Sequence, residues 1–203
     1  MPARYLALGD SYTIGEGVAP EGRWPMRLAR DLRAQGVMLG DPRIIAVTGW
    51  TTDELSAAID AAEPLGEYAL VSLLIGVNNQ YRGRPLDEYA REFEALLRRA
   101  IGFAGGRAGR VLVLSIPDWS VTPFALTSGR DLDAVAADLD AFNAAARTIC
   151  ARHDVAFVDV TAVSRAHGGE AAMLAEDGLH PSAAMYAEWA ALALPAARQL
   201  LAD

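Results

Sequence analysis

The chain has 203 residues, of which 52% are hydrophobic, so it can bury one substantial core but is short for two ordinary domains. Its formal net charge at pH 7 is -8, from 26 acidic and 18 basic residues without a long block of one sign. This charge argues against nucleic acid or an anionic membrane surface as a partner. We therefore expect a single domain over residues 1–203.

The sequence also indicates the cellular compartment in which the protein is expected. Cys150 is the single cysteine, which excludes an internal disulfide and favours a reducing environment. No stretch approaches the ~18 consecutive apolar residues of a transmembrane helix, and the N-terminus enters an apolar run without the pattern of a signal peptide. We expect a soluble, cytoplasmic protein, unless a leader has been removed. The oligomeric state is left open.

Five short apolar runs predict five strands. They are apolar almost throughout and do not alternate, which is typical of strands buried on both faces of a parallel sheet. The runs cover residues 4–8, 43–48, 69–75, 110–116 and 155–160.

Helical spacing fills the gaps between these runs, at residues 26–32, 53–62, 86–100, 132–149 and 182–200. Pro195 is expected to kink or end the last helix. Residues 117–130 show no periodicity and are expected to form a mobile loop over a site. The alternation of strands and helices predicts an α/β fold, a three-layer α/β/α sandwich.

In such sheets, ligands bind beyond the carboxyl ends of the strands. Polar residues and glycines follow the first four predicted strands, so this rule places them at one edge of the sheet. The four segments are Gly9-Asp10-Ser11, Gly49-Trp50-Thr51, Gly76-Val77-Asn78-Asn79 and Pro117-Asp118-Trp119.

Ester hydrolysis by a serine needs a base within reach, an acid that orients the base, and donors for the oxyanion. Of three histidines, His153 ends a helix and His167 lies in a loop. His180 lies at the entry to the last helix, three residues after Asp177, and this spacing can bring the carboxylate to Nδ1 and leave Nε2 free. His180 is therefore the preferred base. The histidines lie in different settings, so no metal site is expected.

Neither Gly-Asp-Ser nor Asp-x-x-His is specific alone, because both also occur in ordinary turns and helix caps. Their placement is informative, since one ends the first strand and the other opens the last helix.

In these motifs the chain resembles the GDSL or SGNH hydrolase superfamily, whose four signature blocks occur in order from Gly9 to Pro181. The resemblance implies that Ser11 is the nucleophile, His180 the general base and Asp177 the residue that orients it. It also implies a flavodoxin-like five-stranded parallel sheet in the order 2-1-3-4-5, a small-molecule ester as substrate, and no cofactor.

The resemblance further implies an oxyanion hole made by the backbone N–H groups of Ser11 and Gly49 and the side-chain amide of Asn78. The third block departs from the family pattern Gly-x-Asn-Asp, because Asn79 stands at the last position. Asn79 is expected to support the loop without touching the substrate. Asp10 is expected to anchor the turn that carries Ser11.

Two tryptophans, Trp50 and Trp119, lie beside the motifs and are candidates for the pocket wall, whereas Trp24 and Trp189 are expected in the core. The segments after the strands are mostly short, which predicts a shallow cleft and a preference for short acyl chains. The natural substrate stays open among acetylated sugars, lysophospholipids, aryl esters and thioesters.

Two alternatives remain. An acyltransferase would use the same triad and differ only in its acceptor. A non-enzymatic flavodoxin-like module would need a phosphate cradle leading directly into a helix, and residues 9–13 make a poor one.

Overall fold

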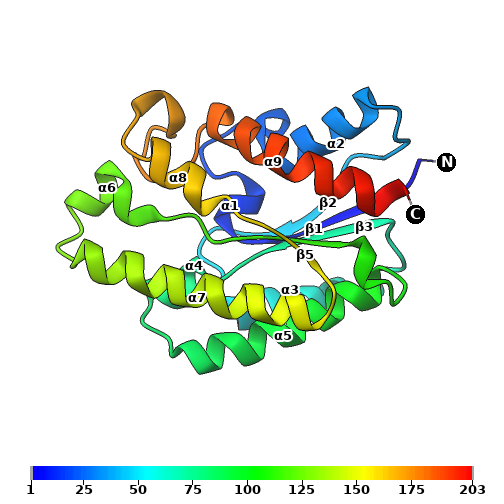
Figure 1. Ribbon diagram of the computed structural model, residues 1–203, viewed down its shortest axis with the longest axis horizontal. Coiled ribbons are helices and arrows are strands. Elements are labelled where there is room, and N and C mark those ends of the chain that lie inside the picture. Colours follow the sequence, from blue (N-terminus) through cyan, green and yellow to red (C-terminus); the bar gives the residue numbers. More distant parts are fainter. Residues whose placement is uncertain (1, 203) are drawn as a thin grey trace.

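A parallel sheet of five strands in the order β2-β1-β3-β4-β5 lies at the centre of the computed structural model, which describes residues 2–202 (Figure 1). This confirms the predicted fold class and strand order. The strands at the second, third, fourth and fifth runs are shorter than the runs that predicted them, because the ends of those runs already belong to loops, whereas the first strand has the expected length and begins one residue later. The strands are β1 (Tyr5–Gly9), β2 (Arg43–Ala46), β3 (Leu70–Leu74), β4 (Val111–Leu114) and β5 (Ala156–Val158).

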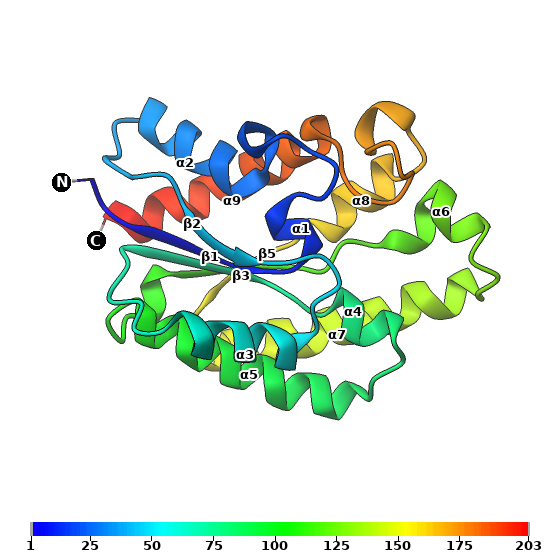
Figure 2. The same cartoon turned by 180° about the vertical axis from the view of Figure 1, so that it is seen from behind.

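Helices cover both faces of the sheet and complete the three layers, as Figures 1 and 2 show from opposite sides. One face carries α2 (Trp24–Ala34), α8 (Thr161–His167) and α9 (Ala183–Ala202). The other carries α3 (Thr52–Ala62), α5 (Leu86–Phe103) and α7 (Leu132–Arg152).

Three shorter helices follow the carboxyl ends of strands: α1 (Ser11–Ile14) after β1, α4 (Val77–Tyr81) after β3 and α6 (Pro123–Leu126) after β4. Four 3-10 turns complete the order: η1 (Pro20–Gly22), η2 (Ala108–Arg110), η3 (Trp119–Val121) and η4 (Ala171–Met173).

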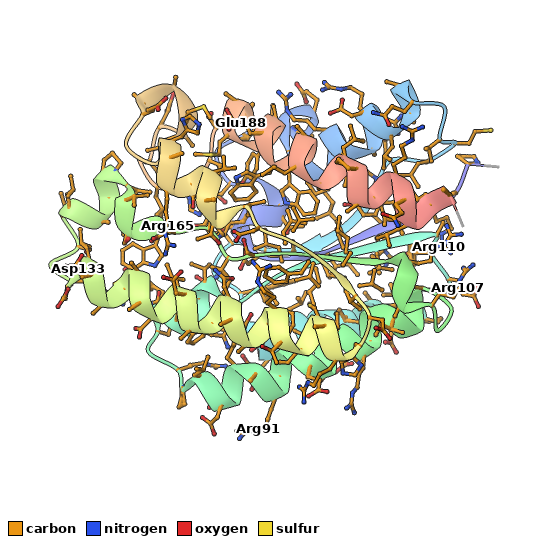
Figure 3. All side chains as sticks on the ribbon, in the orientation of Figure 1. Arg91, Arg107, Arg110, Asp133, Arg165 and Glu188 are labelled. Carbon is orange, nitrogen blue, oxygen red and sulfur yellow. The ribbon has the colours of Figure 1, made fainter. Side chains whose placement is uncertain are left out.

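The core lies between the sheet and the two helical layers. Every residue of β1, β3 and β4 is buried, because helices cover both faces of these central strands. Trp24 and Trp189 are fully buried, as the sequence predicted, and Cys150 is fully buried as well. Charged side chains point outward, for example Arg91 from α5 and Asp133 from α7 (Figure 3). Within residues 2–202, no helix combines the length and apolar character needed to cross a membrane.

The last helix continues through Pro195 to Ala202. The expectation that the helix ends at Pro195 is therefore wrong. A proline removes the N–H that would bond the carbonyl four residues earlier. Here that carbonyl belongs to Ala191, and both Ala191 and Pro195 lie on the exposed side of α9. Water can therefore take the place of the missing donor.

The segment 117–130 also differs from expectation, because it contains η3 and α6 and is not an irregular mobile loop. The Asp118 carboxylate accepts the Ser120 N–H at 2.9 Å and so caps η3. The Thr122 hydroxyl accepts the Ala125 N–H at 3.3 Å and caps α6. Trp119 between these caps is only 2% exposed, so the segment is packed into the protein.

Candidate active site

Strand register brings the predicted motif segments to one edge of the sheet. Gly9, the last residue of β1, pairs with Ala46 of β2 and with Leu74 of β3. The chain therefore leaves all three strands at the same level. Just beyond this edge, a pocket of about 240 Å³ is lined by residues from these segments and from the turn that precedes α9.

Four of the residues predicted for the catalytic triad and the oxyanion hole line this pocket together: Ser11, Gly49, Asn78 and His180. They come from the segments after β1, β2 and β3 and from the start of the last helical segment. Asp177, Asp10 and Asn79 lie behind them and contact the pocket residues or their neighbours, as described below.

Ser11 is the first residue of α1, and Asp10 is the residue that caps this helix. The Asp10 carboxylate accepts the backbone N–H of Tyr12 at 3.0 Å, which anchors the turn. Because Ser11 occupies the first helical position, its own backbone N–H has no acceptor within the helix. Ser11 itself lines the pocket.

The Asp10 side chain is fully buried, and its second oxygen, Oδ2, has no partner among the described residues. Burial raises the pKa of this carboxyl to about 7, although the hydrogen bond from the Tyr12 N–H acts in the opposite direction. A buried carboxyl without a cation beside it favours its neutral form.

His180 is held by Asp177 at two points. Asp177 Oδ2 lies 2.5 Å from His180 Nδ1, and Asp177 Oδ1 accepts the backbone N–H groups of Leu179 and His180, each at 2.9 Å. Partial burial opposes ionisation of Asp177, but the hydrogen bonds from the His180 ring and the two N–H groups hold its pKa below the ordinary value. On the other side, the Tyr12 ring packs against the imidazole with centroids 5.6 Å apart.

The segment after β2 requires a glycine. Gly49 has a φ of +90°, a conformation that side-chain-bearing residues rarely adopt. The next carbonyl, that of Trp50, accepts a hydrogen bond from Asn78 Nδ2 at 2.9 Å. A side-chain amide has two N–H donors, so this bond leaves one donor of Asn78 for a ligand in the pocket.

Asn79 is fully buried and ties α4 to the start of α3 through both ends of its amide. Its Oδ1 accepts the Thr52 N–H at 3.1 Å, and its Nδ2 donates to Thr52 Oγ1 at 2.7 Å. The Thr52 hydroxyl itself donates to Glu92. The hydroxyl has one hydrogen, which it gives to Glu92, so it can only accept a hydrogen bond from residue 79. An amide can donate that bond and a carboxylate cannot, which accounts for Asn79 where the family pattern has an aspartate.

The wall of the pocket is largely aromatic and apolar. Trp119 lies edge-on to Tyr81 and to Phe124, with centroids 5.4 and 6.2 Å apart. The indole N–H of Trp119 donates to Gln80 Oε1 at 3.0 Å, so the polar edge of the ring is already paired within the protein. Trp50 is not among the lining residues and packs, half-buried, against the core.

The other two histidines lie away from the pocket. His153 Nε2 is 2.8 Å from Glu94, and His167 Nδ1 is 2.9 Å from Glu170. Within residues 2–202, no group of three or more potential ligands is placed to hold a metal ion.

Several lining residues were not singled out from the sequence. Tyr12, Val77 and Leu179 each adjoin a predicted site residue, and this adjacency is a signal that could have found them. Tyr81 and Phe124 carry no such signal, because their approach depends on how α4 and α6 fold back over the sheet edge.

Comparison with solved structures shows that this fold is shared. TesA aligns with 22% identity and a TM-score of 0.73, covering 98% of this chain and 99% of that one. A lipase/acylhydrolase from Enterococcus faecalis aligns with 20% identity and a TM-score of 0.71, covering 98% and 96%. Axe2, an acetylxylan esterase from Geobacillus stearothermophilus, aligns with 21% identity and a TM-score of 0.72, covering 96% and 94%.

The comparison with curated protein sequences gives no match. The family model of the GDSL-like lipase/acylhydrolase family matches residues 7–188, which include the last three residues of β1, all of β2 to β5 and all the predicted site residues. The chain therefore belongs to the GDSL-like lipase/acylhydrolase family and is a serine hydrolase of that family.

Proposed function

We propose that the protein hydrolyses short-chain carboxylic esters through an acyl-enzyme on Ser11, with His180 as the general base. The observation that carries this proposal is the convergence of Ser11 and the Asp177-oriented His180 on one pocket. A serine, an imidazole and a carboxylate in this relation are the elements that nucleophilic acyl transfer needs.

In the first half of the reaction, Nε2 of His180 accepts the proton of the Ser11 hydroxyl as Oγ attacks the ester carbonyl. The tetrahedral oxyanion is stabilised by the N–H groups of Ser11 and Gly49 and by the free amide donor of Asn78. The imidazolium then protonates the leaving alcohol, and the acyl group stays on Ser11.

In the second half, His180 accepts a proton from water, which attacks the acyl-enzyme through a similar tetrahedral intermediate. Return of the proton to Ser11 Oγ releases the carboxylic acid. Throughout both halves the Asp177 carboxylate holds the ring and stabilises the imidazolium.

The size of the pocket supports a small acyl group. Its volume is about 240 Å³, and Trp119 and Phe124 are among the residues that line it. Each buried CH₂ contributes ~0.8 kcal/mol, so kcat/KM rises with acyl length only while methylenes still enter the pocket. We propose a preference for acetyl to hexanoyl esters.

The test is hydrolysis of p-nitrophenyl acetate and butyrate by the wild type, Ser11→Ala, His180→Ala and the double variant. Each single variant should lose nearly all activity, and the double variant should be hardly worse, because triad members act as a unit. A phosphonate inhibitor should transfer its phosphonyl group to the Ser11 hydroxyl with loss of its leaving group and the hydroxyl proton, so the peptide that contains Ser11 should gain the mass of the inhibitor less that of the protonated leaving group. Retention of more than about a tenth of kcat in Ser11→Ala would overturn the nucleophile assignment.

The oxyanion assignment has its own test. Asn78→Ala should lower kcat by about 10²–10³-fold if the amide stabilises the oxyanion. An unchanged kcat would move this role to another group.

A further inference from the structure

Residues of α4 and its C-terminal cap hold the segment 48–52, which carries Gly49, through three side chains. Asn78 donates to the Trp50 carbonyl, and Asn79 binds the backbone and side chain of Thr52. The third side chain is that of Arg82, which caps α4 and donates from Nη2 to the Gly49 carbonyl at 2.6 Å.

We propose that Arg82 is a positioning residue of the oxyanion hole, which fixes the Gly49 backbone so that its N–H faces the substrate carbonyl. This inference rests on the proposed function of the pocket. It extends that function to a residue that belongs to none of the four motif segments and does not line the pocket.

Gly49 needs such support because of its own chemistry. Without a Cβ, a glycine populates more of φ/ψ space than any other residue, and Gly49 sits at a φ of +90°. It has no side chain through which packing can hold it. The hydrogen bond at its carbonyl therefore restrains the peptide that follows Gly49 and, through it, the orientation of the residue.

The guanidinium of Arg82 is itself held in place. Its Nη1 lies 3.4 Å from Glu54 Oε2, and the same carboxylate oxygen accepts the Thr51 N–H at 2.9 Å. Arg82 thus spans the Gly49 carbonyl and the first turn of α3. A planar guanidinium keeps its donors in fixed directions, so one group can hold both ends of the segment.

The expected effect of substituting Arg82 depends on the stage of the reaction at which the Gly49 N–H acts. An oxyanion donor acts when negative charge develops in the transition state, and its value comes from being oriented beforehand. Loosening Gly49 should lower kcat with little change in KM, because the ground-state carbonyl gains less from this donor than the oxyanion does.

Arg84 provides a matched control. It lies two positions further along and pairs with Asp53 of α3 through both carboxylate oxygens, at 2.6 and 3.3 Å. It therefore links the same two parts of the fold with the same side chain. Its contacts do not include Gly49.

The experiment compares wild type, Arg82→Ala, Arg82→Lys and Arg84→Ala in kcat, KM, thermal stability and inhibition by a small boronic acid, which forms a tetrahedral adduct with a serine. Arg82→Ala should lower kcat by roughly tenfold, the value of one hydrogen bond to a charged donor. Inhibition by the boronic acid should weaken by a similar factor, while KM stays within about twofold. Arg82→Lys should recover part of the loss, and Arg84→Ala should keep kcat within about twofold.

A decrease in kcat that is no larger in Arg82→Ala than in Arg84→Ala would overturn the inference, as would a loss expressed only in KM. Its failure can be separated from failure of the proposed function, because Ser11→Ala tests the latter alone. The ¹⁵N–¹H signal of Gly49 gives a readout that needs no activity. It should shift in Arg82→Ala and stay in place in Arg84→Ala, and the reverse pattern would also contradict the inference.

Discussion

The Asp177 carboxylate lies 2.5 Å from the His180 ring and accepts the backbone N–H of the same residue at 2.9 Å. One carboxylate therefore fixes both the orientation of the imidazole and the turn that carries it. When Nδ1–H donates to Asp177, Nε2 of the neutral ring is an acceptor. This is the tautomer that a general base needs.

Asp177→Asn should lower kcat by about 10²–10⁴-fold while the fold is retained. The variant keeps an oxygen for the N–H groups of Leu179 and His180, but its amide hydrogens now face Nδ1 of the ring. That arrangement favours the tautomer with its proton on Nε2, which cannot accept the proton of Ser11. Steady-state kinetics with p-nitrophenyl acetate measures the loss, with the exposed Asp133→Asn as control. Activity close to wild type would show that Asp177 does not set the tautomer.

The wild-type kcat/KM should fall as the pH is lowered from about 8 to about 5, because a protonated imidazole cannot act as a general base. The pKa of Asp177 lies below its ordinary value, so its carboxylate stays charged across this range and adds no second step. The measurement is kcat/KM from about pH 5 to about pH 8, where chemistry limits the rate. A flat profile would count against a histidine base.

Asp10 should reduce the stability of the wild type as the pH rises. Burial raises its pKa to about 7, so the folded protein keeps this proton after the unfolded chain has released it at a pH near ~3.9. The stability that the protonated Asp10 carboxyl contributes is fully present below the pKa of Asp10 in the unfolded chain. It is lost as the pH rises to the pKa of Asp10 in the folded protein. Asp10→Asn keeps an acceptor for the Tyr12 N–H and removes the titration.

Relative to wild type, Asp10→Asn should gain on the order of 2–4 kcal/mol in the free energy of unfolding between about pH 4 and about pH 8. Urea unfolding at several pH values measures this. A difference that does not vary with pH would mean that Asp10 titrates alike in both states. The acid limb of kcat/KM should persist in the variant, because the substitution leaves the proposed general base in place.

Asn79→Asp should destabilise the protein, although it restores the residue usual in the family, by about 1–3 kcal/mol. The Thr52 hydroxyl already donates to Glu92, so it cannot also donate to a carboxylate at position 79. Glu92→Gln in the same chain should recover most of the loss, because its amide can donate to Thr52 and free that hydroxyl. A double-mutant cycle of unfolding free energies provides the measurement. Additive effects would show that the three groups are not coupled.

Trp119→Ala should extend the acyl preference, because it removes an aromatic wall of the pocket. Each additional methylene that enters the enlarged pocket should raise kcat/KM, up to about fourfold per CH₂ for a fully buried group. The measurement is kcat/KM for p-nitrophenyl esters from acetyl to palmitoyl, below micelle-forming concentrations. Trp50→Ala is the control, since Trp50 lies outside the lining. Identical chain-length profiles in all three proteins would remove Trp119 from specificity.

The central sheet could be predicted because its strands are apolar at nearly every position. Each short segment therefore indicates by itself that it is buried on both faces. Helices α1, α4, α6 and α8 could not, because helices of 4, 5, 4 and 7 residues are too short for an apolar spacing to recur clearly. The unexpected structure in residues 117–130 has the same cause.

Within the site, local relationships could be predicted and distant ones could not. The contact between Asp177 and His180 spans three residues of one turn, so spacing alone suggests it. The bond from Arg82 to Gly49 depends on how two loops approach each other after the sheet has formed. Likewise, Trp50 and Trp119 both lie beside a motif and were equally good candidates for the pocket wall. Only the packing of the folded chain shows that Trp119 lines the pocket and Trp50 does not.

The attachment of residues 48–52 to α4 also bears on exchange of segments between relatives. Gly49, Trp50 and Thr52 are held by side chains at positions 82, 78 and 79. If residues 48–52 were grafted alone into a relative, the side chains at positions 78, 79 and 82 of that relative would not match the backbone of the grafted segment. The two segments therefore form one unit of exchange, and a chimaera that moves both together should preserve the pocket better than one that moves either.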